Sequence, residues 1–164
     1  MTVWARRASV ALIGVLACAV VALGAVGGGL YWDRVQSRAE QSARAELPAL
    51  AAETIPRIFG FDYQTVETTM TDVYPMLTPR YRPDFEQQVT TVVIPQARER
   101  KLVSQISVIG QGMVDAGRTS ASVLVFLNRT VTDPSGEPFV EPARVRVDYR
   151  KIDGKWLVDM IKPV

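Results

Sequence analysis

An uninterrupted apolar segment near the N-terminus constrains this chain more than any other feature. Residues 8–32 carry no charged side chain, and their centre, 10–23, consists of Ala, Val, Leu, Ile, Gly and Cys. About 20 consecutive apolar residues form a helix that can cross the hydrocarbon core of a bilayer, which is about 30 Å thick. The sequence therefore predicts a single transmembrane helix over residues 8–32.

The residues that flank this segment are of the kind that anchors a helix at a membrane surface. Trp4 precedes the segment, and Tyr31 and Trp32 end it, where aromatic rings favour the headgroup region. Arg6 and Arg7 stand immediately before it, and such basic residues concentrate on the cytoplasmic side. We therefore expect residues 1–7 in the cytoplasm and the rest of the chain, after residue 32, outside a cytoplasmic membrane.

Two alternatives to a retained membrane helix remain open. A cleaved signal peptide has an apolar stretch of about 7–15 residues, which is shorter than this one. A lipoprotein is the second alternative, because Leu16, Ala17 and Cys18 faintly match a lipidation motif, but the apolar run continues beyond Cys18. Gly24 and Gly28 form a pair that lets a second helix approach closely, although glycines merely tolerated in lipid are the simpler interpretation.

The overall composition excludes several classes of site. The chain has 164 residues, a net charge of +2, one Cys and no His. Without His, Ser-His and Cys-His catalytic pairs are excluded, and a zinc or copper site is not expected. The small net charge, with acidic and basic residues interleaved, argues against nucleic acid as a partner. We therefore expect no metal site and no His-based catalytic pair, and we assign no catalytic residue and no cofactor.

Helical patterns follow the apolar segment. Residues 33–48 are rich in Ala, Arg, Glu and Gln, which predicts a polar helical stalk, and Pro48 is expected to interrupt it. An extracytoplasmic domain then spans residues 49–164. Its first helical pattern comprises Leu50, Thr54, Ile55 and Ile58. Pro56 is expected to kink or end that helix.

Two further helices are predicted before the pattern changes. Asp62 or Thr65 is a candidate cap for a helix whose apolar stripe consists of Val66, Met70, Val73 and Leu77. Thr78 and Pro79 signal the start of the next helix. Its expected inner face consists of Tyr81, Phe85, Val89 and Val92. Pro95 is expected to break it, with another helical turn possible over 96–101.

From residue 102 the apolar residues recur with the period of two that is typical of strands. Four strands are predicted: one around Ile106 and Val108, then 120–131, 143–150 and 155–161. Asp153 and Gly154 join the last two as a tight hairpin. Because helices come first and strands follow, the pattern predicts an α+β domain, with about three helices on one face of a curved four-stranded antiparallel sheet.

The opposite face of that sheet is half apolar. It is expected to carry Leu124, Phe126, Leu157 and Ile161 among arginines. Such a face is a candidate surface for binding a partner protein, and an ordinary solvent-facing side of an antiparallel sheet is the alternative.

The ordered motifs of the chain resemble those of the Mce-associated membrane proteins of actinobacteria. They are the anchor, the stalk, the element that begins Phe61-Asp62-Tyr63, residues 77–81, residues 123–128 and the ending that includes Trp156. Pro56 and Gly60 are less typical of the family. The resemblance implies a nuclear-transport-factor-like, or cystatin-like, cone. It also implies a non-enzymatic accessory role beside Mce transporter subunits, whose systems import lipids or sterols across the envelope.

Three functions remain in view. The first is that accessory subunit, and the second is a structural subunit of another envelope machine, such as a type IV secretion scaffold. The third is a small-molecule-binding or enzymatic cone, in which the Asp62 carboxylate and the Tyr63 phenol would move a proton. Asp72, Asp148 and Asp159 are the other candidate bases. We favour a capping role for Asp62 and core packing for Tyr63.

Overall fold

The computed structural model describes residues 38–164. The predicted membrane segment 8–32, Cys18 and the Gly24–Gly28 pair lie outside these residues, as do the expected anchor flanks Trp4, Arg6, Arg7, Tyr31 and Trp32. Within 38–164, no helix combines the length and the hydropathy that crossing a bilayer requires. The compact unit Glu40–Val164 is described below.

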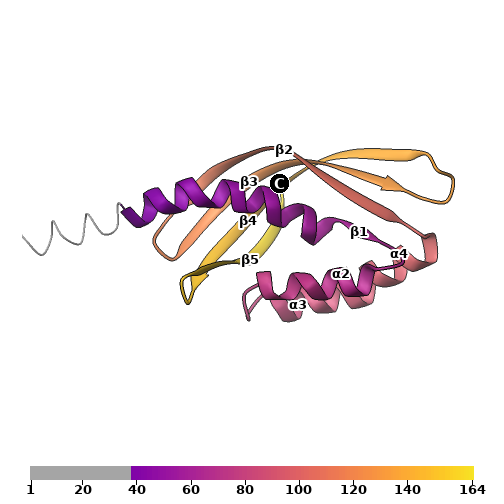
Figure 1. The fold of residues 1–164 in the computed structure, drawn as a ribbon, viewed down its shortest axis with the longest axis horizontal. Coiled ribbons are helices and arrows are strands. Elements are labelled where there is room, and N and C mark those ends of the chain that lie inside the picture. Colours follow the sequence, from indigo (N-terminus) through magenta and orange to yellow (C-terminus); the bar gives the residue numbers. More distant parts are fainter. Residues whose placement is uncertain (1–37) are drawn as a thin grey trace, which may run out of the picture. The chain divides into compact units, whose positions relative to one another are not determined.

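A long first helix spans residues 38–59, and it packs against the sheet (Figure 1). Its buried residues recur every three or four positions: Ala43, Leu47, Ala51, Thr54, Ile55 and Ile58. The helix continues through both prolines to residue 59, so the prediction that Pro48 interrupts it is wrong, and Pro56, predicted to kink or end it, does not end it. A proline inside a helix costs about 3 kcal/mol, but each of these two directly follows a fully buried residue, Leu47 or Ile55, whose burial contributes about 1.5–3 kcal/mol.

The second helical stripe is confirmed. Helix α2 (Val66–Val73) continues into a 3₁₀ turn, η1 (Tyr74–Met76), and the four predicted positions from Val66 to Leu77 are buried. Thr78 then forms the entry to α3 (Arg82–Gln88): its hydroxyl accepts the Tyr81 N–H at 3.2 Å, and its carbonyl accepts the Arg82 N–H at 3.0 Å. Thr78 therefore begins the turn that leads into this helix, as predicted, although the regular helix starts only at Arg82.

A π-helical turn, η2 (Val89–Val93), follows α3 and leads into α4 (Ile94–Arg100). Because a π turn contains one more residue than an α turn, it rotates the following side chains around the helix. Val92, predicted on the inner face, is therefore 43% exposed, and Val93 packs against the core instead. The prediction that Pro95 breaks the helix is wrong. Pro95 lies in the first turn of α4, directly after the wider π turn, and its missing N–H is tolerated at that position.

The sheet is a five-stranded antiparallel meander in the order β1-β2-β3-β4-β5. The strands are β1 (Phe61–Asp62), β2 (Val103–Ala116), β3 (Ser120–Thr132), β4 (Pro138–Ile152) and β5 (Lys155–Pro163). The fifth strand, absent from the four predicted, is the two-residue β1, which is too short to show a periodicity. The predicted hairpin is confirmed: Asp153 and Gly154 have φ of 49° and 79°, as a tight two-residue turn requires.

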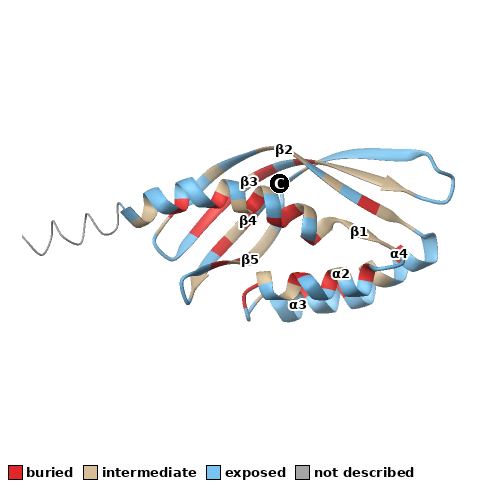
Figure 2. Cartoon of the chain, viewed as in Figure 1, coloured by how far each residue is buried: buried red, intermediate tan, exposed pale blue. Residues whose placement is uncertain are grey.

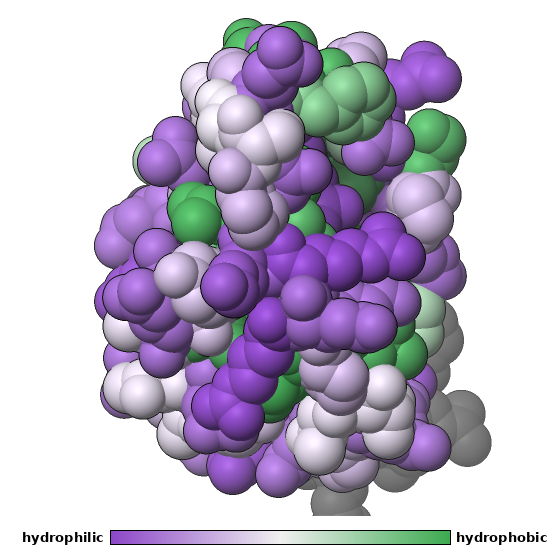
Figure 3. Space-filling view, turned by 90° about the vertical axis from the view of Figure 1, so that its right-hand side faces the viewer, coloured by the Kyte–Doolittle hydropathy of each residue, from purple (hydrophilic) through white to green (hydrophobic). Residues whose placement is uncertain are grey.

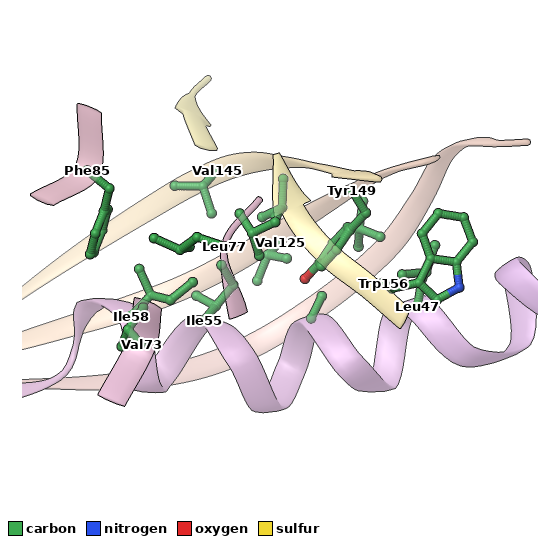
Figure 4. Close-up of a cluster of buried hydrophobic side chains, with 14 of the residues drawn as sticks. Leu47, Ile55, Ile58, Val73, Leu77, Phe85, Val125, Val145, Tyr149 and Trp156 are labelled. Carbon is green, nitrogen blue, oxygen red and sulfur yellow. The ribbon is translucent and has the colours of Figure 1, made fainter. Parts of the chain in front are cut away.

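The core lies between the helices and one face of the sheet, where Figure 2 shows the buried residues. Figure 4 shows Leu47 and Ile55 of the long helix and Val125 and Tyr149 of the sheet extending into it. Alternation along β3 and β4 places the buried residues as predicted: Val123, Val125, Leu127, Val145, Val147 and Tyr149. We call this the inner face and the opposite one the outer face.

A bulge in β5 corrects one predicted placement. Leu157 pairs with Arg150 on the outer face, and simple alternation would put Ile161 on that face too. The register shifts between Asp148 and Tyr149, which leaves Asp159 as an extra residue in β5. Ile161 consequently pairs with Val147 and lies on the inner face.

Candidate functional site

A cavity of about 380 Å³ lies between the helices and the inner face of the sheet. Small-molecule sites in proteins typically enclose about 300–1,000 Å³. Its apolar lining comes from the end of the first helix, β1, α2 to α4 and the sheet: Ile58, Phe59, Phe61, Met70, Phe85, Val89, Val93, Ala97, Leu102, Val145, Ile161 and Pro163. Tyr81, Gln88, Gln96 and Arg129 are its polar members. The arrangement is that of a hydrophobic pocket with a few placed polar groups.

Arg129 is the charged residue of this lining. Its Nε donates to the Ser104 hydroxyl at 3.2 Å, and that buried hydroxyl donates to the Phe59 carbonyl at 3.1 Å. Within residues 38–164, Arg129 forms no ion pair with a carboxylate. Glu141 stands opposite it in the β3–β4 register but is exposed and unpaired with it. The guanidinium is therefore held at one edge only.

Sequence reasoning missed Arg129, although the sequence carries a signal for it. The inner-facing alternation Val123, Val125, Leu127 continues to position 129, so an arginine occupies a place where the pattern calls for an apolar residue. A charged residue on a core-facing position is a marker of a site or a buried network. The pattern alone does not say which residues surround it.

Tyr81 supplies a neutral hydroxyl to the same wall. Burial raises the pKa of its phenol, with the nearby Asp84 charge acting in the same direction and the Ile161 backbone acting against it. Its ring lies 6.2 Å from the Phe85 ring, and Phe85 also meets Tyr74 edge-on at 6.5 Å. This aromatic group fixes the wall formed by α3.

The residues proposed for proton transfer do not meet in the cavity. Asp62 Oδ1 accepts the Gln64 N–H at 2.8 Å, which is a local turn, and the Tyr63 hydroxyl accepts from the Gln64 side chain at 3.0 Å. The Tyr63 N–H donates to the Leu102 carbonyl, and its ring packs against the core. Of the Phe61-Asp62-Tyr63 element, Phe61 lines the cavity. The element thus serves as a turn and a core contact.

Trp156 and the other candidate bases also lie elsewhere. Trp156 is buried in the core, with the Lys151 ammonium 5.3 Å from its ring centre, and Asp72 is exposed. Asp148 is on the outer face, where it accepts from Ser122 at 2.6 Å and from Arg146 at 2.9 Å. Among the described residues, no carboxylate lines the cavity.

Asp159, the bulge residue, fastens the α3 entry to the sheet. Its carboxylate accepts from the Thr78 hydroxyl at 2.9 Å and from Arg80 at 2.8 Å, with Arg150 at 3.4 Å. Burial by itself would raise the pKa of Asp159, but the hydrogen bonds and the two positive charges outweigh it and hold that pKa below its ordinary value. The Thr78 N–H also donates to the Val158 carbonyl at 2.9 Å. This carboxylate is structural.

The outer face keeps three of the four residues predicted for a partner surface. Leu124 and Phe126 stand opposite Arg146 and Arg144, and Leu157 stands opposite Arg150. Phe126 is 38% exposed. Each of these apolar side chains therefore has an arginine as its neighbour on the adjacent strand.

Further exposed apolar residues lie near the β3–β4 hairpin, where Phe139 is 67% exposed and Val140 is 53% exposed. Figure 3 views the end of the domain that carries this hairpin and α4. Hydrophilic residues cover most of that end, and hydrophobic ones show between them in small separate groups. That end therefore presents no continuous apolar surface.

No protein-family profile matches the chain. The chain is 27% identical over 161 residues to Outer membrane protein Rv1973 of Mycobacterium tuberculosis, a match that covers 98% of this chain and 99% of that protein. It is 26% identical over 145 residues to the uncharacterized protein Rv1362c of the same organism, covering 86% of this chain and 66% of the relative.

Solved structures with a similar fold include proteins of type IV secretion systems. An IcmL-like protein from Legionella pneumophila superposes with a TM-score of 0.65 at 12% identity, covering 74% of this chain and 91% of that one. The periplasmic domain of DotI gives 0.65 at 10% identity (73% and 94% covered). CagV, a VirB8 homolog from Helicobacter pylori, gives 0.59 at 9% identity (73% and 97%). The domain therefore has the VirB8-like arrangement of helices on an antiparallel sheet, which confirms the predicted α+β fold class.

Proposed function

We propose that this protein is a non-enzymatic accessory subunit of a Mce-type lipid or sterol import system, held at the cytoplasmic membrane by residues 8–32. The observation that carries the proposal is a similarity that extends over 98% of the chain to a mycobacterial outer membrane protein. The ordered motifs from Phe61 to Trp156 add the Mce assignment through their resemblance to the Mce-associated proteins. The relative's name concerns the outer membrane, whereas the apolar segment and its arginines favour the cytoplasmic membrane.

The roles of the motif residues support a scaffold rather than a catalyst. Asp62 closes a turn, Tyr63 and Trp156 pack in or against the core, and none of the three lines the cavity. A proton-transfer enzyme would need a base in the cavity that is deprotonated near neutral pH. The polar residues of the lining are arginine, tyrosine and glutamine, and none of these is such a base. The motif thus specifies the fold.

The outer face is the docking surface that this function would use. Phe126, Leu124 and Leu157 supply apolar contact, and the neighbouring arginines supply the planar donors that are enriched in protein interfaces. A partner with a complementary acidic and apolar strip would fit there.

A second candidate is a structural subunit of a secretion-type envelope machine, favoured by the likeness to the IcmL-like protein and the DotI periplasmic domain. Purification of the full chain in a mild detergent separates the two. Co-purifying Mce proteins and their permease would support the first candidate, and co-purifying secretion subunits would support the second.

A further inference from the structure

We propose that the cavity binds a single-chain carboxylic acid of medium length, whose carboxylate pairs with Arg129 and whose chain lies among the apolar residues of α2, α3 and the sheet. This inference concerns a small-molecule site and is independent of the partner that the domain serves. It goes beyond a scaffold role because it gives the domain a ligand.

The size and the walls of the cavity select the chain. Met70 and Phe85 from the helices face Val145 and Ile161 from the sheet across it. A volume of about 380 Å³ is near the lower end of the range for small-molecule sites, so one chain fits better than a two-chain lipid. A flexible apolar ligand would replace water along walls that offer few hydrogen-bond partners.

The charge of the cavity selects the headgroup. Arg129 brings the positive charge, and no carboxylate of the described residues lines the cavity to balance it. A cation would be repelled, and a neutral ligand would cover the guanidinium without giving its charge a counter-ion, which is costly. An anion removes both penalties.

The geometry of Arg129 selects a carboxylate. Its Nε is fixed by Ser104, which is itself fixed by the Phe59 carbonyl, so the orientation of the guanidinium plane is set by the protein. An arginine fork matches the two oxygens of a carboxylate, and such charge-assisted pairs are the strong ones. Gln88, Gln96 and the neutral Tyr81 hydroxyl are further donors in the lining.

Photo-crosslinking of the full chain in lipid nanodiscs tests the proposal. The probe is a twelve-carbon fatty acid with a diazirine on its chain, and cross-linked peptides are located by mass spectrometry. We expect labelling of the segment 82–100, with excess dodecanoate suppressing it at least about tenfold more effectively than dodecanol, the difference that one charge-assisted pair contributes. Absence of label in that segment, or equal competition by the alcohol, would overturn the proposal.

Substitutions separate the headgroup contact from a general effect on folding. Arg129→Met should reduce labelling by the acid at least about tenfold and leave labelling by the diazirine-bearing alcohol unchanged, while Arg129→Lys should restore part of it. Arg144→Met, on the outer face, is the matched control and should behave as wild type. If Arg129→Met labels like wild type, the proposal is wrong. If Arg129→Met fails to fold, the competition between acid and alcohol on the wild-type chain decides alone.

Discussion

Truncation of Leu47 tests whether the first helix belongs to the core of the domain. Leu47 is fully buried and packs in the same cluster as the residues of the sheet, although it lies in the stretch that composition predicts to be a polar stalk. Leu→Ala at a buried site costs about 2–5 kcal/mol, more where the surroundings cannot close the space. Because Trp156 of that cluster is itself slightly exposed, we expect partial relaxation and a loss of about 3 kcal/mol in the free energy of unfolding.

Urea unfolding of the full chain in a mild detergent, followed by far-ultraviolet circular dichroism, measures this loss. With a denaturant dependence of about 2 kcal/mol per molar, the midpoint should fall by about 1.5 M. Glu46→Ala, at an exposed neighbouring position, is the control and should shift it little. Were the helix a free stalk, Leu47→Ala would be neutral or slightly stabilising, since alanine is the better helix former. A midpoint shift equal to that of the control would refute the packing described here.

Three further predictions concern single side chains. Tyr149→Phe should lower stability by less than about 1 kcal/mol in the same urea assay, because its buried hydroxyl lies beside Thr54 but forms no regular hydrogen bond within residues 38–164; a larger loss would show that the contact with Thr54 is a hydrogen bond. The folded-state pKa of Asp159 lies below its unfolded value, so its contribution to stability is present above about pH 4 and is lost as the pH falls through the folded pKa. Asp159→Asn should therefore flatten the fall in melting temperature between pH 7 and pH 3, and an unchanged slope would contradict the Thr78 and Arg80 contacts. Phe126→Asp should abolish co-purification of the partner while leaving the melting temperature within about 2 °C, and retained co-purification would exclude the outer face as the docking surface.

The elements that depend on local pattern were predictable from the sequence. The stripe from Val66 to Leu77 repeats with the helical period, and the β3 and β4 residues alternate with the strand period. Asp153 and Gly154 both adopt positive φ, which these two residue types accept readily. In each case the determining interactions lie within a few residues of one another.

The errors arise where a distant contact or an inserted residue decides the outcome. Pro48 remains helical because Leu47 is buried by the sheet, which no local pattern reveals. One extra residue in η2 turns Val92 outward, and one extra residue in β5 turns Ile161 inward. A shift of one residue in the periodic pattern is enough to move the side chains that follow to the opposite face of the element.

The candidate site was the least predictable feature. The cavity gathers side chains from the first helix, α2 to α4 and four strands, and their proximity follows only from the folded topology. Asp62 and Tyr63 are adjacent in the sequence, which suggested a proton-transfer pair. In the structure both side chains accept hydrogen bonds from Gln64, and neither lines the cavity. Arg129 is visible in the sequence as a break in an apolar alternation, whereas its neighbour Ser104 comes from another strand.

Affinity purification of the full chain from its native membranes, in a mild detergent and after brief chemical cross-linking, tests the proposed function most directly. The protein is tagged at the C-terminus, and the Phe126→Asp chain serves as the matched control for surface-specific capture. The account predicts that Mce proteins and their permease are recovered with the wild-type chain and are depleted with the variant. Recovery of secretion subunits in their place, or recovery of Mce proteins at the level of an untagged strain, would contradict it.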